Sequence, residues 1–370
     1  MVEIAPVTRG RDLEQFIAFP YEHHRSDPHW VPALRMDVRT LLSPEKNPFF
    51  QHAEARYFLA RSNGRVVGRI AAIRNEAHNR LHEDRVGFYG FFEAVDDARV
   101  AGALFDAAAE WLRHRGLDTM RGPMNPSIND ECGLLVWGFG TPPTLMMPYN
   151  PPYYVALHED AGFTKAKDLL VYEGTGGAGP PGRYTRAAEI LAKRRGITLR
   201  GLDMKRFANE IELIKQLYNQ AWEKNWGFVP LTGAEIDHLA KQLKPVVVPD
   251  LVVFAEHQGE PIGFAAALPD LNVALKRNPS GRLFPGILKV LWHARHVRRL
   301  RILLLGLRPE YRQSGADALM YHWIWTQGER RGMLWGEAGW VLEDNAAMNN
   351  AITNLGFRHY KTYRIYDRPL

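Results

Sequence analysis

Two stretches of this chain resemble each other at a separation of about half its length. The first contains Gly64 and Gly68 within apolar sequence, and the second contains Gly259 and Gly263 in the same arrangement, 195 residues later. Each stretch predicts two strands joined by a tight turn, because a glycine between two runs of β-forming residues is typical of a hairpin. A hairpin repeated at this distance predicts that the chain contains one fold twice.

A second landmark repeats at nearly the same separation. Asp160–Phe163 and Asn354–Phe357 both end in Gly-Phe and are 194 residues apart. Two landmarks at one offset favour duplication, and 370 residues is a usual length for two domains. The order in each half is a strand, helical segments, the hairpin, a strand, a helix and closing strands. We therefore predict an α/β (α+β) fold of two domains, each a twisted mixed sheet of about six strands flanked by helices.

A glycine- and proline-rich stretch separates the two repeats. Residues 174–182 have the composition of a linker, and a short helical pattern over 184–194 follows them. We predict one domain over 1–173, a linker and short helix over 174–195, and a second domain over 196–370.

The second half contains a motif that is similar to one in a known family. Leu305–Leu319 combines a strand end, a short turn through Gly315 and the start of a helix. This pattern resembles the acyl-CoA-binding motif of the GNAT superfamily of N-acyltransferases, and the whole chain resembles a tandem GNAT protein. The resemblance implies that the second domain binds acyl-CoA through Leu305, Leu307, Arg312, Gln313, Ser314, Gly315, Ala316 and Asn345.

The chemistry of the turn suits a pyrophosphate independently of the resemblance. Amides at a helix N-terminus have no partner within the helix, and they lie at the positive end of its dipole. Gly315 allows close approach of the backbone, and Arg312 adds positive charge. Asp317 stands where the motif has glycine or alanine, and its carboxylate could repel phosphate or cap the helix. The matching place in the first half holds Asp96 and Asp97, so CoA is not expected to bind there.

N-acyl transfer needs a group that takes a proton from the amine. In GNAT-like proteins the acyl carbonyl lies where two neighbouring strands diverge, so the resemblance implies a carboxylate on the fifth strand. Glu337 is one candidate base, and Glu343 is another, although an acid there could equally cap a helix. The usual leaving-group tyrosine of the family corresponds to Ile352, so that general acid is missing.

Several polar and aromatic residues are candidates for holding the amine. A turn-rich stretch of the first half contains Asp130 and Glu131, which could bind the amine or act as its base, or could simply stabilise turns. We also predict substrate-binding residues on the first half and on the second: Asn129, Tyr153, Tyr154, Trp226, Asp270 and Asn272.

A basic and apolar stretch precedes the acyl-CoA motif. Residues 284–301 place apolar side chains at helical spacing among lysines and arginines. Such a helix could lie on an anionic membrane surface, guide the acidic CoA, or pack on its own domain with its charges in water. The chain is mildly basic, with 47 Lys+Arg against 41 Asp+Glu, but no nucleic-acid module is recognisable, so we expect no nucleic-acid partner.

The usage of cysteine and histidine predicts no metal site. Cys132 is the single cysteine, and His23 and His24 have no ligand-like neighbours in the sequence. The first residues are charged and lack the apolar core of a signal peptide, so we expect a cytoplasmic protein, at most peripheral on the inner membrane.

Two short sequence segments make the resemblance to a particular group of proteins more specific. Tyr149–Tyr154 and Trp340–Asn345 are similar to segments in a group of bacterial tandem proteins that includes the bacterial ceramide synthases. This resemblance implies that a fatty acyl-CoA acylates the amine of a long-chain amino alcohol, which is a lipid acceptor. Two alternatives stay open: an acetyltransferase of a small amine or a protein, and a GNAT-fold binding protein without catalysis.

Overall fold

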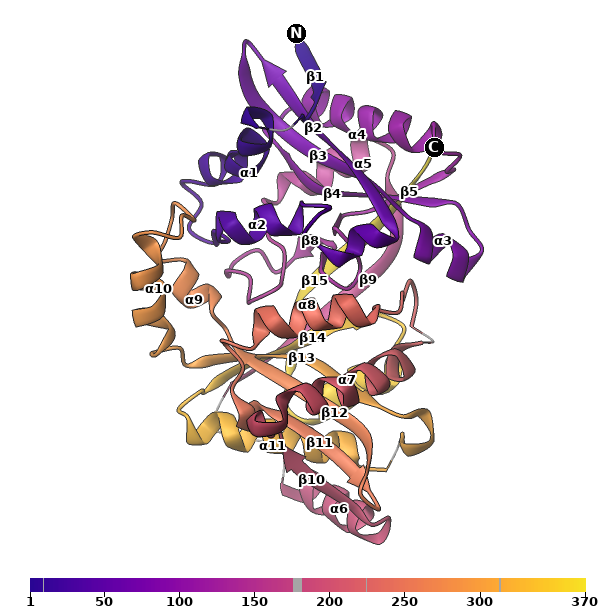
Figure 1. Cartoon of the computed structure of the whole chain (residues 1–370), viewed down its shortest axis with the longest axis vertical. Coiled ribbons are helices and arrows are strands. Elements are labelled where there is room, and N and C mark those ends of the chain that lie inside the picture. Colours follow the sequence, from indigo (N-terminus) through magenta and orange to yellow (C-terminus); the bar gives the residue numbers. More distant parts are fainter. Residues whose placement is uncertain (9, 176–181, 224, 313) are drawn as a thin grey trace. The chain divides into compact units, whose positions relative to one another are not determined.

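The structure is a computed structural model that describes residues 1–8, 10–175, 182–223, 225–312 and 314–370. Packing divides the chain into two compact units, each a mixed sheet with helices against it (Figure 1). Unit 1 consists of Met1–Leu169, Asn272–Arg295 and Lys361–Leu370, and unit 2 consists of Leu170–Leu271 and His296–Tyr360. These units are not contiguous in sequence, whereas the domains expected over 1–173 and 196–370 are, and those ranges stay a prediction.

In unit 1 the strand order is β1-β2-β3-β4-β5-β15-β9, with β8 also paired to β15, and the unit boundary falls within β9 and β15. The strands are β1 (Val2–Pro6), β2 (Ala53–Ser62), β3 (Arg65–Asn75), β4 (Val86–Ala94), β5 (Thr119–Gly122), β8 (Leu134–Trp137), β9 (Thr164–Thr175) and β15 (Arg358–Pro369), beside a separate pair of β6 (Met124–Asn125) and β7 (Glu131–Cys132). The helices are α1 (Arg11–His23), α2 (Arg35–Leu41), η1 (Pro48–Gln51), α3 (Glu76–His82), α4 (Ala98–Arg113), α5 (Tyr153–Asp160), α9 (Asn272–Leu275) and α10 (Gly286–Ala294).

In unit 2 the strand order is β10-β11-β12-β13-β14-β9. The strands are β10 (Ile197–Gly201), β11 (Val252–His257), β12 (Glu260–Pro269), β13 (Arg299–Leu307) and β14 (Trp335–Leu342). The helices are α6 (Gly182–Arg194), η2 (Met204–Arg206), α7 (Phe207–Trp222), α8 (Gly233–Leu243), η3 (Pro249–Leu251), η4 (Pro309–Tyr311), α11 (Ala316–Arg330) and α12 (Ala346–Asn354). Helix α6 covers the helical stretch expected after the linker, while linker residues 176–181 lie outside the described part of the chain.

The structure confirms the two predicted hairpins. The antiparallel pairs β2–β3 and β11–β12 turn at Gly64 and Gly259, whose φ angles of 74° and 82° lie in the left-handed region that glycine adopts without strain. The two Gly-Phe pairs of the second landmark also lie at matching places in the two units. Gly162 and Gly356 have φ angles of 83° and 89° just beyond the ends of α5 and α12. Both units therefore repeat one mixed α/β plan, as the offset of the landmarks predicted.

In both units, two parallel strands flank a helix and then diverge. In unit 2 the pairing of β13 with β14 extends only from Arg299–Trp335 to Ile302–Ala338, although β13 continues to Leu307. In unit 1 the pairing of β4 with β5 ends at Phe88. Strands that separate in this way open a gap in the sheet at their C-terminal ends.

The apolar pattern explains how these elements pack. Strand β4 is buried along its whole length, as its nearly continuous apolar sequence requires, and α4 covers it with one apolar face. Leu104 and Phe105 of α4 are fully buried, and burying one such side chain stabilises the fold by about 1.5–3 kcal/mol. The side chain of Asp97 accepts a hydrogen bond from the amide of Arg99 and begins the helix.

Candidate active site

The turn before α11 has the backbone geometry of an anion cradle. Gly315 is the N-cap residue of α11 with a φ of 82°, and Ala316 is the first helical residue and is fully buried. The hydroxyl of Ser314 accepts a hydrogen bond of 3.3 Å from the amide of Ala316. Other amides of the first turn have no partner inside the helix, because the helix has no earlier carbonyls to offer them.

The surroundings of this turn have structural roles too. A Cβ on Gly315 would lie 3.2 Å from the backbone of Ala188, so α6 approaches the turn closely. Arg312 is exposed and donates to the carbonyl oxygen of Ala221 at the end of α7, at 3.1 Å. Asp317 lies in the first helical turn, where a carboxylate is stabilised and competes with phosphate for the same positive end. Gln313 lies outside the described residues.

The two leucines expected beside the acyl-CoA lie on β13. Leu307 is buried and Leu305 half-buried against the core of unit 2. Both belong to the part of β13 that has already separated from β14. Asn345 is the N-cap of α12, and its side chain accepts from the amide of Met348 at 3.2 Å, a structural task.

Glu337 is held in a buried ion pair. It lies opposite Arg301 in the parallel register, and one carboxylate oxygen is 3.3 Å from the guanidinium. The other oxygen accepts the hydroxyl proton of Tyr360. The side chain of Glu337 is only 1% exposed, so a substrate amine cannot reach it without a change in packing. Glu343 is half-buried at the end of β14, and its role stays a prediction.

In unit 1 the loop that carries three predicted residues is internally hydrogen-bonded. Ser127 donates to the carboxylate of Asp130 at 2.7 Å and accepts from the amide of Asn129, while Glu131 is exposed. Just before this loop, Asn125 of β6 accepts a hydrogen bond from the amide of Phe91 in β4 at 2.6 Å.

Three further predicted residues are tied to other groups. Asp270 is buried, 3.6 Å from the Nε of Arg299. Asn272 is buried in unit 1 and donates to the carbonyl oxygen of Pro143 at 3.0 Å. Trp226 is half-buried after α7. These contacts fix the positions of the side chains, and their part in binding a substrate stays a prediction.

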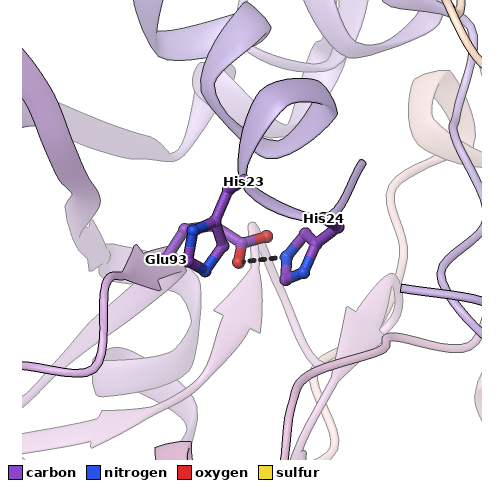
Figure 2. Close-up of side chains that lie close together, drawn as sticks. All are labelled: His23, His24 and Glu93. Atoms are coloured by element: carbon purple, nitrogen blue, oxygen red, sulfur yellow. Dashed lines mark hydrogen bonds and ion pairs between the residues drawn. The ribbon is translucent and has the colours of Figure 1, made fainter. Parts of the chain in front are cut away.

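Tyr153 and Tyr154 meet a group of polar residues that the sequence did not indicate. His23, the last residue of α1, and His24, its cap, lie beside Glu93 near the end of β4 (Figure 2). Glu93 is 2.8 Å from the Nε2 of His24 and accepts from the hydroxyl of Tyr154 at 2.7 Å. The expectation that the two histidines have no ligand-like neighbours was wrong, because Glu93 is distant in sequence.

The charges of this group are arranged around Glu93. Burial alone would raise the pKa of Glu93, but His24, Arg69 and the Tyr154 hydroxyl together hold it at about 2. Burial lowers the pKa of His23 to about 4, with a further contribution from His24. Near neutral pH the group therefore contains an ionised carboxylate and a neutral His23. A signal existed in the sequence: Glu93 is a lone acid at the end of the apolar strand β4.

Comparison with known proteins shows to which family the chain belongs. No known family model matches the chain. It is 40% identical to the bacterial ceramide synthase of Caulobacter vibrioides over 380 residues, covering 100% of this chain and 98% of that protein. It is 36% identical to protein YghO of Escherichia coli, covering 97% of this chain and 93% of that protein.

Solved structures share the fold at low identity. A tandem GNAT protein from the clavulanic acid biosynthesis pathway is 13% identical with a TM-score of 0.57, covering 100% of this chain and 98% of that one. A GCN5-related N-acetyltransferase from Sphaerobacter thermophilus is 13% identical with a TM-score of 0.54, covering 100% and 95%. These likenesses show the fold, and the full-length identity shows the family. The chain therefore belongs to the family of the bacterial ceramide synthase, and its fold is that of the tandem GNAT proteins.

Proposed function

We propose that this enzyme transfers an acyl group from a long-chain acyl-CoA to the amine of a long-chain amino alcohol. The full-length identity of 40% to a bacterial ceramide synthase carries this proposal. In the reaction the amine nitrogen attacks the thioester carbon, a C–N bond forms and the C–S bond breaks. The amine loses one proton, and CoA leaves as its thiol.

Unit 2 has the features of the donor side. The strands β13 and β14 diverge after Ile302 and Ala338, and the turn at Gly315 begins α11 beside that gap. We assign the pyrophosphate to the amides of the first turn of α11 that follow Ala316, with Arg312 supplying charge and Leu305 and Leu307 lining the gap.

Replacing Arg312 with Glu tests the donor site. The variant reverses one charge beside the turn, and we expect the Kd for palmitoyl-CoA to rise at least tenfold. Arg330→Glu is the matched control, because it makes the same charge change at the opposite, exposed end of α11. Equal affinity in the two variants would locate the CoA elsewhere.

Helix α10 of unit 1 supports a lipid acceptor. Four large apolar side chains are between 55% and 74% exposed: Leu288, Leu291 and Trp292 of α10, and Phe284 just before it. Neighbouring exposed apolar side chains of this size are unusual on the surface of a monomer and mark interaction surfaces. The segment 280–301 contains arginine and lysine but no Asp or Glu. Among the described residues, no helix is both long and apolar enough to cross a membrane. We propose that α10 inserts its apolar face into an anionic lipid surface, where its cationic residues meet the headgroups.

Turnover tests the proposed function. Release of CoA thiol from palmitoyl-CoA should require sphinganine, and acetyl-CoA should be a poor donor. Preference for acetyl-CoA with a small amine would favour the conventional acetyltransferase. Binding of acyl-CoA without turnover on any amine would favour a binding protein.

A further inference from the structure

The cluster of His23, His24, Glu93, Tyr153 and Tyr154 lies entirely in unit 1, and three of its elements converge there. Helix α1 ends with His23, β4 brings Glu93, and α5 begins with the two tyrosines. His23 stacks on Phe19 at a centroid distance of 5.1 Å, which fixes the plane of its ring. A group assembled from such distant segments is positioned by the fold and not by local chain geometry.

Counting protons defines which atoms are donors. The Tyr154 hydroxyl donates to Glu93 and accepts from the amide of Ala94 at 3.0 Å. The Tyr153 hydroxyl donates to the carbonyl oxygen of Ala94 at 2.8 Å. Both tyrosine protons are thus used, so His23 must carry its proton on Nε2, which is 3.0 and 3.2 Å from the two hydroxyl oxygens.

This tautomer leaves the Nδ1 lone pair of His23 available. Within the described part of the chain, no group donates to that atom, and His23 is half-buried, like Tyr153. By contrast, His24, Glu93 and Tyr154 are buried beneath them. The cluster therefore has a buried base of fixed hydrogen bonds and one open acceptor at its accessible edge.

The positions of the protons also argue against a metal ion bound by His23, His24 and Glu93. The ligand atoms of His23, His24 and Glu93 lie within 4.8 Å of one another, a grouping that could in principle hold one. However, ionised Glu93 can only accept, so the Nε2 of His24 also carries a proton. The buried guanidinium of Arg69 lies 3.7 Å from Glu93 and balances its charge. Two protonated ligand atoms and a neighbouring cation favour a hydrogen-bonding site.

The segment that leads into α10 is attached to residues that follow His23 and His24 in the sequence. Arg35 donates to the carbonyl oxygens of Ser280 and Gly281. Lys276 donates to the carbonyl oxygen of Pro28. Trp30 from the same stretch stacks on His24 at 5.5 Å. A polar site in the same unit as an exposed apolar helix suits a molecule with a polar head and a hydrocarbon tail.

We propose that this cluster binds the polar head of the acceptor, with the Nδ1 of His23 accepting a hydrogen bond from the hydroxyl or amine of an amino alcohol. This inference rests on the proposed function and adds the residue that recognises the acceptor. Because Glu93 and Arg69 balance each other, the site has no excess positive charge to repel an amine. The low pKa of His23 keeps Nδ1 unprotonated near neutral pH.

His23→Gln is the informative variant. The glutamine amide can occupy the place of Nε2 and still donate to the tyrosine oxygens, but it has no counterpart to Nδ1. His114→Gln is the matched control, because His114 is an exposed histidine at the end of α4 in the same unit. The measurement is the Kd of sphinganine, with palmitoyl-CoA affinity and the melting temperature recorded alongside.

We expect His23→Gln to raise the Kd and KM of sphinganine at least tenfold, with acyl-CoA affinity and melting temperature unchanged. Unchanged sphinganine binding in this variant would overturn the inference and leave the proposed function intact. Failure of the wild-type protein to bind sphinganine would overturn both. Activity lost on chelation and restored by Zn²⁺ would assign the cluster to a metal and overturn this inference.

Discussion

Glu93 and Glu337 are both buried carboxylates on strands, yet their partners give them different roles. Glu337 is matched by Arg301 on the neighbouring strand and by the hydroxyl of Tyr360. Glu93 instead contacts Tyr154 and His24, which are buried beside the half-buried His23 and Tyr153. Sequence reasoning found Glu337 because the resemblance implies a carboxylate on the fifth strand, but a strand's sequence cannot reveal the cation that lies opposite it. It missed Glu93 because the partners come from α1 and α5.

At the scale of single residues, Glu337→Ala should destabilise unit 2. It removes the carboxylate from the buried ion pair with Arg301, and breaking such a pair typically costs about 3–5 kcal/mol. Denaturant unfolding measures this loss. A variant with unchanged stability and abolished turnover would instead identify Glu337 as the base.

A second prediction at this scale concerns His158, which is fully buried among aromatic rings. Burial lowers its pKa to about 4, against an opposing hydrogen bond to the carbonyl oxygen of Tyr154. The unfolded state therefore binds the proton more readily, so stability is full above about pH 6.5 and falls as the pH drops towards 4. The shift corresponds to on the order of 3 kcal/mol.

His158→Phe should remove this contribution, because a phenyl ring does not titrate. Thermal unfolding between pH 7 and 4 measures the effect, and the melting temperature of the variant should fall less steeply than that of the wild type. Parallel curves would show that His158 does not cause the acid sensitivity.

At the scale of elements, the sequence predicted what local chemistry determines. The hairpins at Gly64 and Gly259 and the helix after Gly315 follow from glycine geometry and apolar periodicity. The close approach of Ala188 to Gly315 was not predictable, because it depends on how α6 packs against α11. Gly315 therefore forms the turn before α11 and also allows α6 to pack closely. The motif indicated only the turn.

Paired glycine variants separate these effects. Gly315→Ala introduces a side chain at positive φ and 3.2 Å from Ala188, and should cost about 1–2 kcal/mol. Gly102→Ala in α4 meets nothing within 4 Å and should stabilise by about 0.5–1 kcal/mol. Thermal unfolding compares them, and a stabilising Gly315→Ala would contradict the left-handed turn.

Helix α10 provides the other prediction at this scale. The double variant Leu288→Glu with Trp292→Glu should reduce flotation with phosphatidylglycerol vesicles at least tenfold, since it places charge on the exposed apolar face. Leu81→Glu, at a leucine of α3 that is 50% exposed, is the control and should float like the wild type. Equal flotation of all three proteins would remove the membrane proposal.

At the scale of the whole molecule, the duplication was readable from two landmarks, but the composition of the packed units was not. Residues 272–295 and 361–370 pack in unit 1, although both follow the linker in sequence. Strand β15 pairs with β5 from Gly122–Tyr366 to Thr119–Pro369. The residue pattern of a strand specifies which of its faces is apolar, but it does not specify which sheet the strand joins.

The central claim is that this enzyme forms an amide between a fatty acyl group and a long-chain amino alcohol. The most direct test is mass spectrometry of products after incubation with sphinganine and an equimolar mixture of palmitoyl-CoA and acetyl-CoA. We predict N-palmitoyl sphinganine as the main product, with loss of one CoA thiol for each amide formed. Exclusive formation of N-acetyl sphinganine, or no amide with either donor, would contradict the account.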